Sequence, residues 1–371
     1  MSKRRVRRGW KGRLLALMAL AVWLVPPLHA QSDEAPNADT MGADEANWLV
    51  LPYASYSPTT EIAVGLVVGY YRMSRPGRRA SSVTATFTGT QRRQLIAEAE
   101  PELYLADGRW RVEGQLIASD YPNLFYGVGG DTPMAAETAY TARYGTVDLS
   151  AQRQVRPQLR AGPRLFVRTG TVRNVDEGTP LARGRVPGAD GGTTLGVGVS
   201  ALWDARSRRY DPRRGTYAEA SLLLHSAAWG SDYTFGRLTT DGRGYRPVGP
   251  GVAAVQLYTE AVVGTAPFQL LPLLGGSDRM RGFREGRYRD DVYWTAQAEY
   301  RVPLFWRFKA AAFASVGATG PRVDASLVEN AVAAVGVGGW LRLTDDGVHG
   351  RLDLAYSESG VEVYVSLGEA F

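Results

Sequence analysis

The sequence predicts an all-β protein, a transmembrane antiparallel β-barrel of about 16 strands. Three observations predict this fold. An export signal opens the chain, and after it many segments of roughly ten residues alternate between apolar and polar side chains. No later segment has the unbroken apolar run of a membrane-spanning helix. Because a closed barrel pairs every backbone group, its strands need only modest hydrophobicity to lie in lipid.

Residues 1–30 have the pattern of a secretory signal peptide. A basic start, MSKRRVRRGWKGR, precedes an apolar core at residues 14–25, and a small residue, Ala30, ends the segment. The alternative is a short membrane anchor, but the apolar core is too short for one and a polar segment follows it. We therefore expect an exported chain.

The charge balance changes once residues 1–30 are set aside, because they carry seven bases and no acids. The rest of the chain contains 36 Lys and Arg and 37 Asp and Glu, which gives a net charge of −1. The basic pI of the full chain therefore gives no argument for nucleic-acid binding. The chain has no cysteine, which excludes a disulfide scaffold and thiolate metal sites. Residues 31–47 read as a flexible acidic lead-in, and residues 48–371 as one barrel domain.

The segment at residues 292–302 shows the alternation clearly. One face is apolar and the other polar; the apolar face consists of Val292, Trp294, Ala296, Ala298, Tyr300 and Val302. A soluble β-sandwich also alternates, so the pattern alone leaves that fold open. Strand length, export and aromatic residues near many segment ends, such as Trp110 and Trp203, favour a membrane barrel with interfacial girdles.

The lengths of the connections also favour a barrel. The expected long connections are residues 121–137, 172–191, 267–290 and 318–330, and the short ones include 106–108, 303–305 and 345–348. Outer-membrane barrels combine short periplasmic turns with longer external loops. If both chain ends face the periplasm, residues 267–290 form the sixth external loop.

Three motifs go beyond periodicity. They are RGF at residues 281–283, within the charged stretch GGSDRMRGFREGRYRD; WDARSRRYDPRRGTY at 203–217; and FYGVGGDT at 125–132. Together they resemble the BamA/TamA superfamily, the bacterial surface-antigen barrels, over essentially the whole mature chain. That family has an Arg-Gly-Phe/Tyr tip on its sixth loop and an Asp-x-Arg…Pro-x-x-Gly turn. The turn residues here, which we interpret as structural, are Asp204, Arg206, Asp211, Pro212 and Gly215.

The resemblance implies a 16-stranded barrel in the outer membrane of a Gram-negative-type bacterium, with the sixth loop folded into the lumen. Arg281 matches the family's tip arginine and Glu299 its inward acid, and the alternation independently places Glu299 on a polar face. Gly282 would allow close backbone approach, and Phe283 would wedge the tip against the wall. The alternative for Arg281 is a surface arginine that touches anionic lipopolysaccharide.

We expect the other arginines of this loop to be solvated; they are Arg279, Arg284, Arg287 and Arg289. The sequence also departs from the family pattern. There is no room for the periplasmic POTRA domains of many members, and Ser315 stands where a second carboxylate partner of the arginine is usual. Phe371 fits a C-terminal assembly signal on the apolar face of the last strand, although Glu369 occupies an unusual position on that face.

An enzyme is not expected. His225 and His349 are the histidines after residue 30, and neither lies near a nucleophile motif such as G-x-S-x-G. No cluster of His, Asp and Glu has metal-ligand spacing, and no glycine-rich segment opens a helix, so no metal or cofactor is expected.

The resemblance implies a function in membrane biogenesis or transport, namely helping proteins or lipids into or across the outer membrane. A passive channel or structural barrel that acts with a separate periplasmic partner is the alternative. The partners expected are outer-membrane lipid and lipopolysaccharide, the barrel assembly machinery during insertion, and an unidentified periplasmic partner or cargo. Nucleic acid is not expected.

Overall fold

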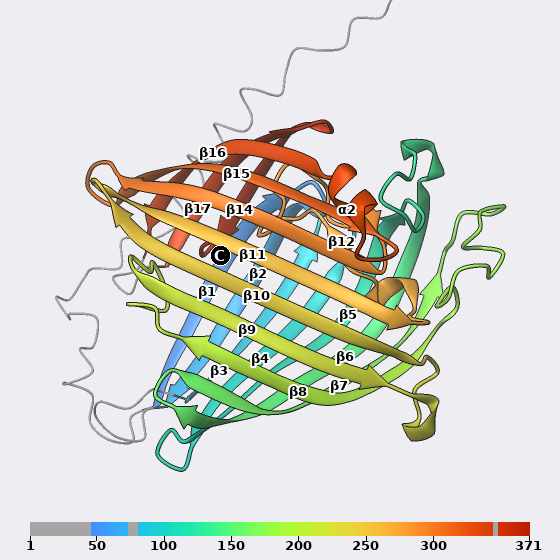
Figure 1. Ribbon diagram of the computed structural model, residues 1–371, viewed down its shortest axis with the longest axis horizontal. Coiled ribbons are helices and arrows are strands. Elements are labelled where there is room, and N and C mark those ends of the chain that lie inside the picture. The colour runs from blue at the N-terminus through green and yellow to red at the C-terminus, as the bar shows by residue number, and fades with distance from the viewer. Residues whose placement is uncertain (1–45, 73–80, 344–347) are drawn as a thin grey trace, which may run out of the picture. The chain divides into compact units, whose positions relative to one another are not determined.

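The computed structural model describes residues 46–72, 81–343 and 348–371 (Figure 1). The expected signal peptide, residues 31–45 of the expected lead-in and part of the expected turn at 345–348 lie outside the described residues.

Within the described part of the chain, sixteen antiparallel strands form a closed barrel, which confirms the fold class and the strand number. Each strand pairs with its neighbours in the sequence, and β1 pairs with β18 to close the ring. The strands are β1 (Ala46–Ser57), β2 (Glu61–Arg72), β3 (Ser81–Thr90), β4 (Leu95–Leu105), β5 (Trp110–Phe125), β6 (Thr138–Arg156), β7 (Leu159–Arg173), β8 (Gly191–Asp204), β9 (Gly215–His225), β10 (Phe235–Val248), β11 (Gly251–Gly264), β14 (Val292–Pro303), β15 (Phe308–Gly320), β16 (Val332–Arg342), β17 (His349–Ser357) and β18 (Gly360–Leu367).

Two further short strands, β12 (Leu273–Leu274) and β13 (Tyr288–Arg289), pair with each other inside the connection between β11 and β14. The short helix α2 (Ala325–Glu329) lies between β15 and β16. Among the described residues, no helix is long and apolar enough to cross a membrane.

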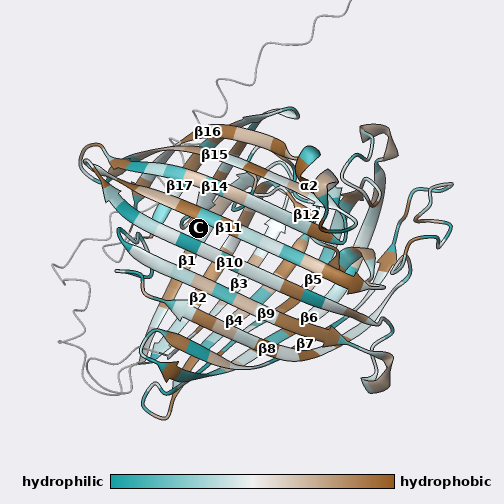
Figure 2. Cartoon of the chain, in the orientation of Figure 1, coloured by the Kyte–Doolittle hydropathy of each residue, from teal (hydrophilic) through white to brown (hydrophobic). Residues whose placement is uncertain are grey.

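The two faces of each strand differ in burial as the alternation predicts (Figure 2). On β14, Thr295, Gln297 and Glu299 are buried, whereas Ala298 and Tyr300 are exposed. On β16, Val335 and Val337 are exposed on the outer face. Because the sheet is closed, the polar face of each strand points to the barrel axis and the apolar face points outward.

The connections alternate between two ends of the barrel, which we call the turn end and the loop end. The described turn-end connections are residues 106–109, 157–158, 205–214, 249–250 and 304–307, at the left of Figure 1. The loop end, at the right, includes the longer connections 126–137, 174–190, 265–291 and 321–331. The first of these starts later than expected, because the β5–β6 pairing continues to Phe125 and Thr138.

The closing pair of strands is less regular than its neighbours. In the described residues, the register of β1 with β18 consists of one pair, Tyr56 with Val365, whereas β1 pairs with β2 along its whole length. Unpaired backbone groups are costly in lipid, so this seam is the weakest lateral contact of the ring.

Candidate functional site

The connection of residues 265–291, which we call the 265–291 segment, carries the RGF motif and follows β11. The β12–β13 pair folds this segment back on itself, and the Gly276 amide donates to the Phe283 carbonyl at 3.1 Å. Gly282 has φ +111, and a Cβ there would lie 3.1 Å from the Cβ of Ala334. Glycine is therefore required at this point both by the backbone conformation and by the close approach to β16.

Arg281 is fully buried between two carboxylates. Its Nη2 lies 2.6 Å from Glu299 Oε2 on β14, and its Nη1 lies 2.7 Å from Asp353 Oδ2 on β17. The guanidinium also lies 3.5 Å from the centre of the Phe313 ring. The two Nη atoms of the planar guanidinium thus each contact a carboxylate, and an aromatic ring packs against its plane. This arrangement favours arginine over lysine.

The second carboxylate comes from a position that the sequence did not indicate. Ser315 occupies the position where the family pattern has an acid; it is buried, and its hydroxyl has no partner among the described residues. Asp353 takes the role of partner instead, from a strand two further along the ring. The sequence did place Arg351 and Asp353 two residues apart, on the polar face of β17. That spacing alone could not identify Asp353 as a partner of Arg281.

The residues beside Arg281 are held by the last two strands. The Gly282 amide donates to Tyr364 Oη at 2.9 Å, and the Ser357 hydroxyl donates to the Gly282 carbonyl at 2.6 Å. Phe283 is fully buried in an apolar cluster. The other members of that cluster are Tyr258, Leu274, Met280, Tyr293 and Ala334.

The expectation that the remaining arginines of the segment are solvated is wrong. Arg287 and Arg289 are 8% and 2% exposed, and Arg279 and Arg284 are partly buried. Arg289 Nη1 donates to the Phe268 carbonyl at 2.9 Å, and Arg287 Nη2 donates to the Thr132 carbonyl at 2.8 Å. Because the segment folds back on itself, backbone carbonyls that an open loop would leave in water become acceptors for these side chains.

The ion pairs of Arg281 continue toward the turn end. Glu299 Oε1 lies 2.6 Å from Arg301 Nε, and Arg301 Nη1 lies 2.6 Å from Glu369 Oε2. Asp353 Oδ2 lies 2.9 Å from Arg351 Nε, close enough for an ion pair. We call this set the ion chain; in order it contains Arg351, Asp353, Arg281, Glu299, Arg301 and Glu369.

Phe371 does not lie on the apolar face of the last strand, so the expected placement is wrong. Strand β18 ends at Leu367, and Gly368, with φ +84, turns the chain away from the strand. Phe371 is 3% exposed and packs with Tyr245, Val252 and Ala254 on the inner face of β10 and β11. Arg301 Nη2 donates to the Phe371 carbonyl at 2.9 Å. Glu369 is therefore not an irregular member of the apolar face but the partner of Arg301.

The β8–β9 turn at residues 205–214 is shaped by an ion pair, a proline and a glycine. Arg206 pairs with Asp204 through two nitrogens, at 2.9 and 3.0 Å. Pro212 is buried, and Gly215 has φ +108, with the Ala205 carbonyl 2.2 Å from where a Cβ would be. Glycine is required there because any side chain would collide with the backbone.

The same turn contacts two strands on nearly opposite sides of the ring. Asp211 Oδ2 lies 2.5 Å from Lys309 Nζ on β15, and Arg209 pairs with Glu102 on β4. Six strands separate β4 from β15 on one side of the ring and eight on the other. The turn therefore spans the opening at the turn end, a contact that its sequence did not suggest.

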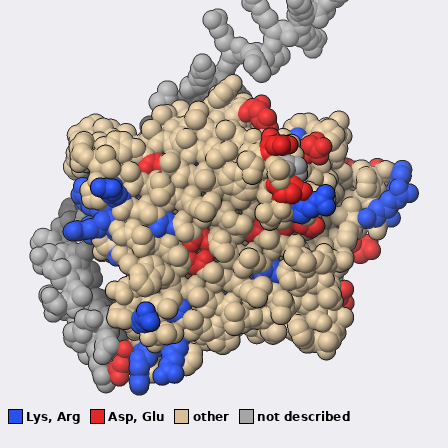
Figure 3. All heavy atoms as spheres, in the orientation of Figure 1, with Lys and Arg blue, Asp and Glu red and all other residues tan. Residues whose placement is uncertain are grey.

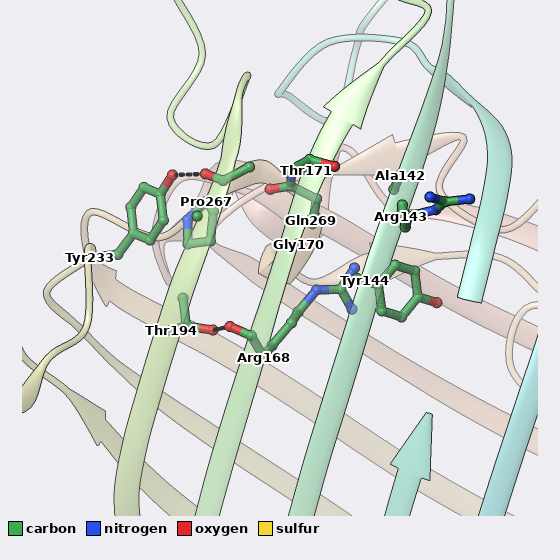
Figure 4. A pocket seen from close by; sticks show the side chains of 12 residues that line it. Ala142, Arg143, Tyr144, Arg168, Gly170, Thr171, Thr194, Tyr233, Pro267 and Gln269 are labelled. Carbon is green, nitrogen blue, oxygen red and sulfur yellow. Dashed lines mark hydrogen bonds between the residues drawn. The ribbon is translucent and has the colours of Figure 1, made fainter. Parts of the chain in front are cut away.

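Two cavities differ in what they could hold. One, of about 20 Å³, lies between β6, β7, β8 and the 265–291 segment; there Arg168 covers the Tyr144 ring at 3.6 Å and Gln269 approaches from the segment (Figure 4). It has room for about one water molecule. The second, of about 640 Å³, is polar and lies among the inner faces of β3 to β9, with Glu100, Glu113 and Arg164 in its wall.

Among the described residues, His225 and His349 lie beside aromatic side chains. His225 stacks on Phe235, with ring centres 4.0 Å apart, and His349 is buried beside Trp340. Among the described residues, no three or more His, Cys, Asp or Glu side chains are grouped so that they could hold a metal ion.

The closed ring of alternating strands defines an integral outer-membrane β-barrel protein. The Omp85 superfamily domain model matches residues 79–367, so the chain belongs to the Omp85 superfamily. This confirms the resemblance to the BamA/TamA barrels and the location in the outer membrane of a Gram-negative bacterium. No curated protein matches the sequence.

Solved structures agree on the fold. BamA from Haemophilus ducreyi lacking POTRA domains 1–3 is 13% identical, with a TM-score of 0.61, over 88% of this chain and 70% of that chain. CdiB from Acinetobacter baumannii is 10% identical, with a TM-score of 0.55, over 88% and 65%. CdiB from Escherichia coli is 12% identical, with a TM-score of 0.58, over 86% and 62%. This chain thus spans less than two thirds of either CdiB chain.

Proposed function

We propose that the 265–291 segment plugs the barrel and that Arg281, Gly282, Phe283 and Glu299 lock it in the lumen. The plugged barrel would help proteins or lipids into or across the outer membrane, with the turn end facing the periplasm. The observation that carries the proposal is the complete burial of Arg281 between Glu299 and Asp353. An arginine without water must keep both partners, so the segment has one strongly preferred position.

Support for a plug also comes from contacts at several points around the ring. The segment bonds β17 and β18 through Gly282 and the β1–β2 turn through Arg284, which donates to the Pro58 carbonyl at 2.7 Å. It also bonds the 126–137 connection, where the Gly129 amide donates to the Arg289 carbonyl at 2.8 Å. A segment tied to strands so far apart obstructs the space between them.

Arg281→Ala tests the lock. We expect the variant to fold into a barrel that converts from its heat-modifiable form at a lower temperature and conducts ions more often in planar bilayers. Arg322→Ala is the matched control, because Arg322 pairs with Asp324 on an exposed loop. If Arg281→Ala matches the wild type in both measurements, the lock does not exist.

The biogenesis role needs a cellular test. After depletion of the protein, we expect the level of other outer-membrane proteins or the lipid balance of the membrane to change. An unchanged outer-membrane proteome and lipid composition would contradict the role. We propose no enzymatic activity. We further propose that the barrel assembly machinery inserts the chain, with Phe371 as part of the signal, and that a periplasmic partner or cargo binds at the turn end.

A passive channel is the second candidate, and the polar cavity of about 640 Å³ favours it. Conductance of the wild type and of a variant that lacks residues 275–288 distinguishes the two candidates. A steady conductance in the wild type that the deletion does not increase would favour the channel. A closed wild type that the deletion opens would favour the plug.

A further inference from the structure

The turn end of the barrel carries a large excess of arginine. Three neighbouring connections, with the strand ends that flank them, are residues 106–109, 153–160 and 204–214. They hold nine arginines and three aspartates. At the opposite end, residues 126–137 hold Asp131 and Glu137 and no base. In Figure 3 the blue spheres gather along the left and lower left, the side of the turn end in Figure 1, apart from groups at the right.

Six of the nine arginines are exposed and form no ion pair within the described part of the chain. We call them the turn-end arginines; they are Arg109, Arg153, Arg156, Arg208, Arg213 and Arg214. Of the other three, Arg206 pairs with Asp204, Arg209 pairs with Glu102, and Arg160 is partly buried and donates to the Gly108 carbonyl. Arg109 Nε donates to the Ala106 carbonyl of its own turn at 3.2 Å, but the side chain is exposed. Exposed guanidinium groups without an ion-pair partner are available to an anion from outside the chain.

The three connections lie side by side. The Gln154 amide donates to the Arg109 carbonyl at 2.7 Å, and the Asp204 amide donates to the Gln158 carbonyl at 2.9 Å. Within the third connection, the Ser207 hydroxyl accepts from the amides of Arg213 and Arg214 at 3.2 and 3.3 Å. The connections that carry the turn-end arginines are therefore neighbours on a fixed backbone. Arg109, Arg153 and Arg156 lie at strand ends on the rim of the barrel, whereas Arg208, Arg213 and Arg214 lie on the turn that spans the opening.

Exposed apolar residues place this surface at the depth of a lipid headgroup. Trp110 follows Arg109 directly and Val155 lies between Arg153 and Arg156; both are exposed. Trp110 is the cross-strand partner of Arg153, so these two side chains share one face of the sheet. Trp203 is likewise exposed just before the third connection. Tryptophan concentrates where the hydrocarbon meets the headgroups, and arginine beside it extends toward the phosphate layer.

We propose that Arg109, Arg153 and Arg156, the turn-end arginines at the ends of β5 and β6, bind the phosphate groups of anionic phospholipids in the leaflet that surrounds the turn end. Arginine binds phosphate through two parallel hydrogen bonds, and each basic residue near an anionic surface adds to the attraction. The alternation of arginine with exposed apolar side chains favours a lipid surface over an acidic protein partner, which would not need the apolar residues. This inference depends on the proposed function in one respect: which leaflet surrounds the turn end follows from the proposal that this end faces the periplasm.

The test compares headgroup selectivity in reconstituted vesicles by electron spin resonance of spin-labelled phosphatidylglycerol and phosphatidylcholine. We expect the wild type to prefer phosphatidylglycerol several-fold in low salt and to lose most of the preference in about 0.5 M salt, where exposed charges are screened. The variant Arg109→Gln/Arg153→Gln/Arg156→Gln should lower the preference at least threefold. Arg183→Gln/Arg185→Gln, on the exposed connection 174–190, is the matched control and should retain it.

Several outcomes would overturn the proposal. They are a wild type without headgroup preference, a preference that does not respond to salt, or a preference that the control variant loses as strongly as the triple variant. Lower capture of an acidic periplasmic protein by the triple variant, with unchanged lipid selectivity, would mean that the surface binds protein instead. If the triple variant does not fold, two measurements still test the proposal. The salt series on the wild type should show the loss of headgroup preference, and the three corresponding Arg→Lys changes, which keep the charge, should retain most of that preference. Because this readout is independent of conductance, its failure leaves the plug untouched.

Discussion

Arg301 Nη1 lies 2.6 Å from Glu369 Oε2, and through this pair the residues after the last strand join the ion chain that holds Arg281. The contact joins the residues after the last strand to the 265–291 segment, a loop-end connection, by alternating charges. Every ion-chain member between Arg351 and Arg301 is buried. Buried alternating charges depend on one another, because removal of one leaves its neighbour without compensation in a low-dielectric environment.

Asp353→Asn should be among the most destabilising polar changes in the barrel. The variant removes a charge from a buried pair, so we expect the free energy of unfolding to fall by about 3 kcal/mol. Guanidinium unfolding in detergent measures it. Arg322→Gln, in the exposed Arg322–Asp324 pair, is the control and should change the same quantity by less than about 1 kcal/mol. Equal effects of the two variants would show that burial of Asp353 does not matter.

Gly282→Ala should displace the tip of the 265–291 segment. A Cβ at this position would combine an unfavourable backbone conformation with contacts of 3.1 and 3.3 Å to the Cβ atoms of Ala334 and Ser357. Those atoms are fixed to strands, so we expect a loss of about 2–4 kcal/mol. Gly178→Ala separates the two effects, because Gly178 also has positive φ but open space around its Cβ. Thermal unfolding should place Gly282→Ala clearly below Gly178→Ala; a reversed order would disprove the close contact.

Glu369→Gln and Asp353→Asn should not be additive. The two carboxylates lie at different positions of the ion chain but share Arg301, Glu299 and Arg281 between them. We expect an interaction free energy of at least about 0.5 kcal/mol in a double-mutant cycle of unfolding free energies. A parallel cycle with Asp148→Asn in place of Asp353→Asn supplies the control, because Asp148 pairs with Arg164 outside the ion chain. Additivity in both cycles would mean that the ion chain does not couple its ends.

The Asp211–Lys309 contact should depend on pH in the acid range. Burial alone would raise the pKa of the Asp211 carboxyl. The hydrogen bond and the charge of Lys309, together with the charges of His349 and Arg301, lower this pKa by more than burial raises it, so the pKa of Asp211 lies below its usual value. The folded state therefore binds the proton less tightly than the unfolded state does. The stabilisation is present above the unfolded pKa and is lost as the pH falls through the folded pKa.

The corresponding measurement is the difference in unfolding free energy between the wild type and Asp211→Asn as a function of pH. We expect this difference to be constant from pH 8 to about pH 5 and to shrink below about pH 4. Lys309→Gln should abolish the pH dependence of the difference. A difference that shrinks near pH 7 instead would assign the titration to another group.

The sequence predicted the barrel because alternation is a local property. Along the segment at residues 292–302, each side chain's face follows from its parity, and the structure has the same faces. The same reasoning placed Glu299 on the inner wall. It could not select Asp353 as a partner of Arg281, because 72 residues separate them and only the folding of the 265–291 segment against β17 and β18 brings the two side chains together. Phe371 was misplaced since parity assumes that a strand continues, and Gly368 ends it.

The β8–β9 turn, which contacts both Glu102 and Lys309, is a cross-link between two distant points of the ring. A ring of hydrogen-bonded strands can change from a circular to an oval cross-section, but this cross-link limits the distance between the two strands that it contacts. Deformation of the cross-section must then occur in the two arcs of strands between β4 and β15. One arc contains the single-pair contact of β1 with β18, so the strain of any widening at this end concentrates there.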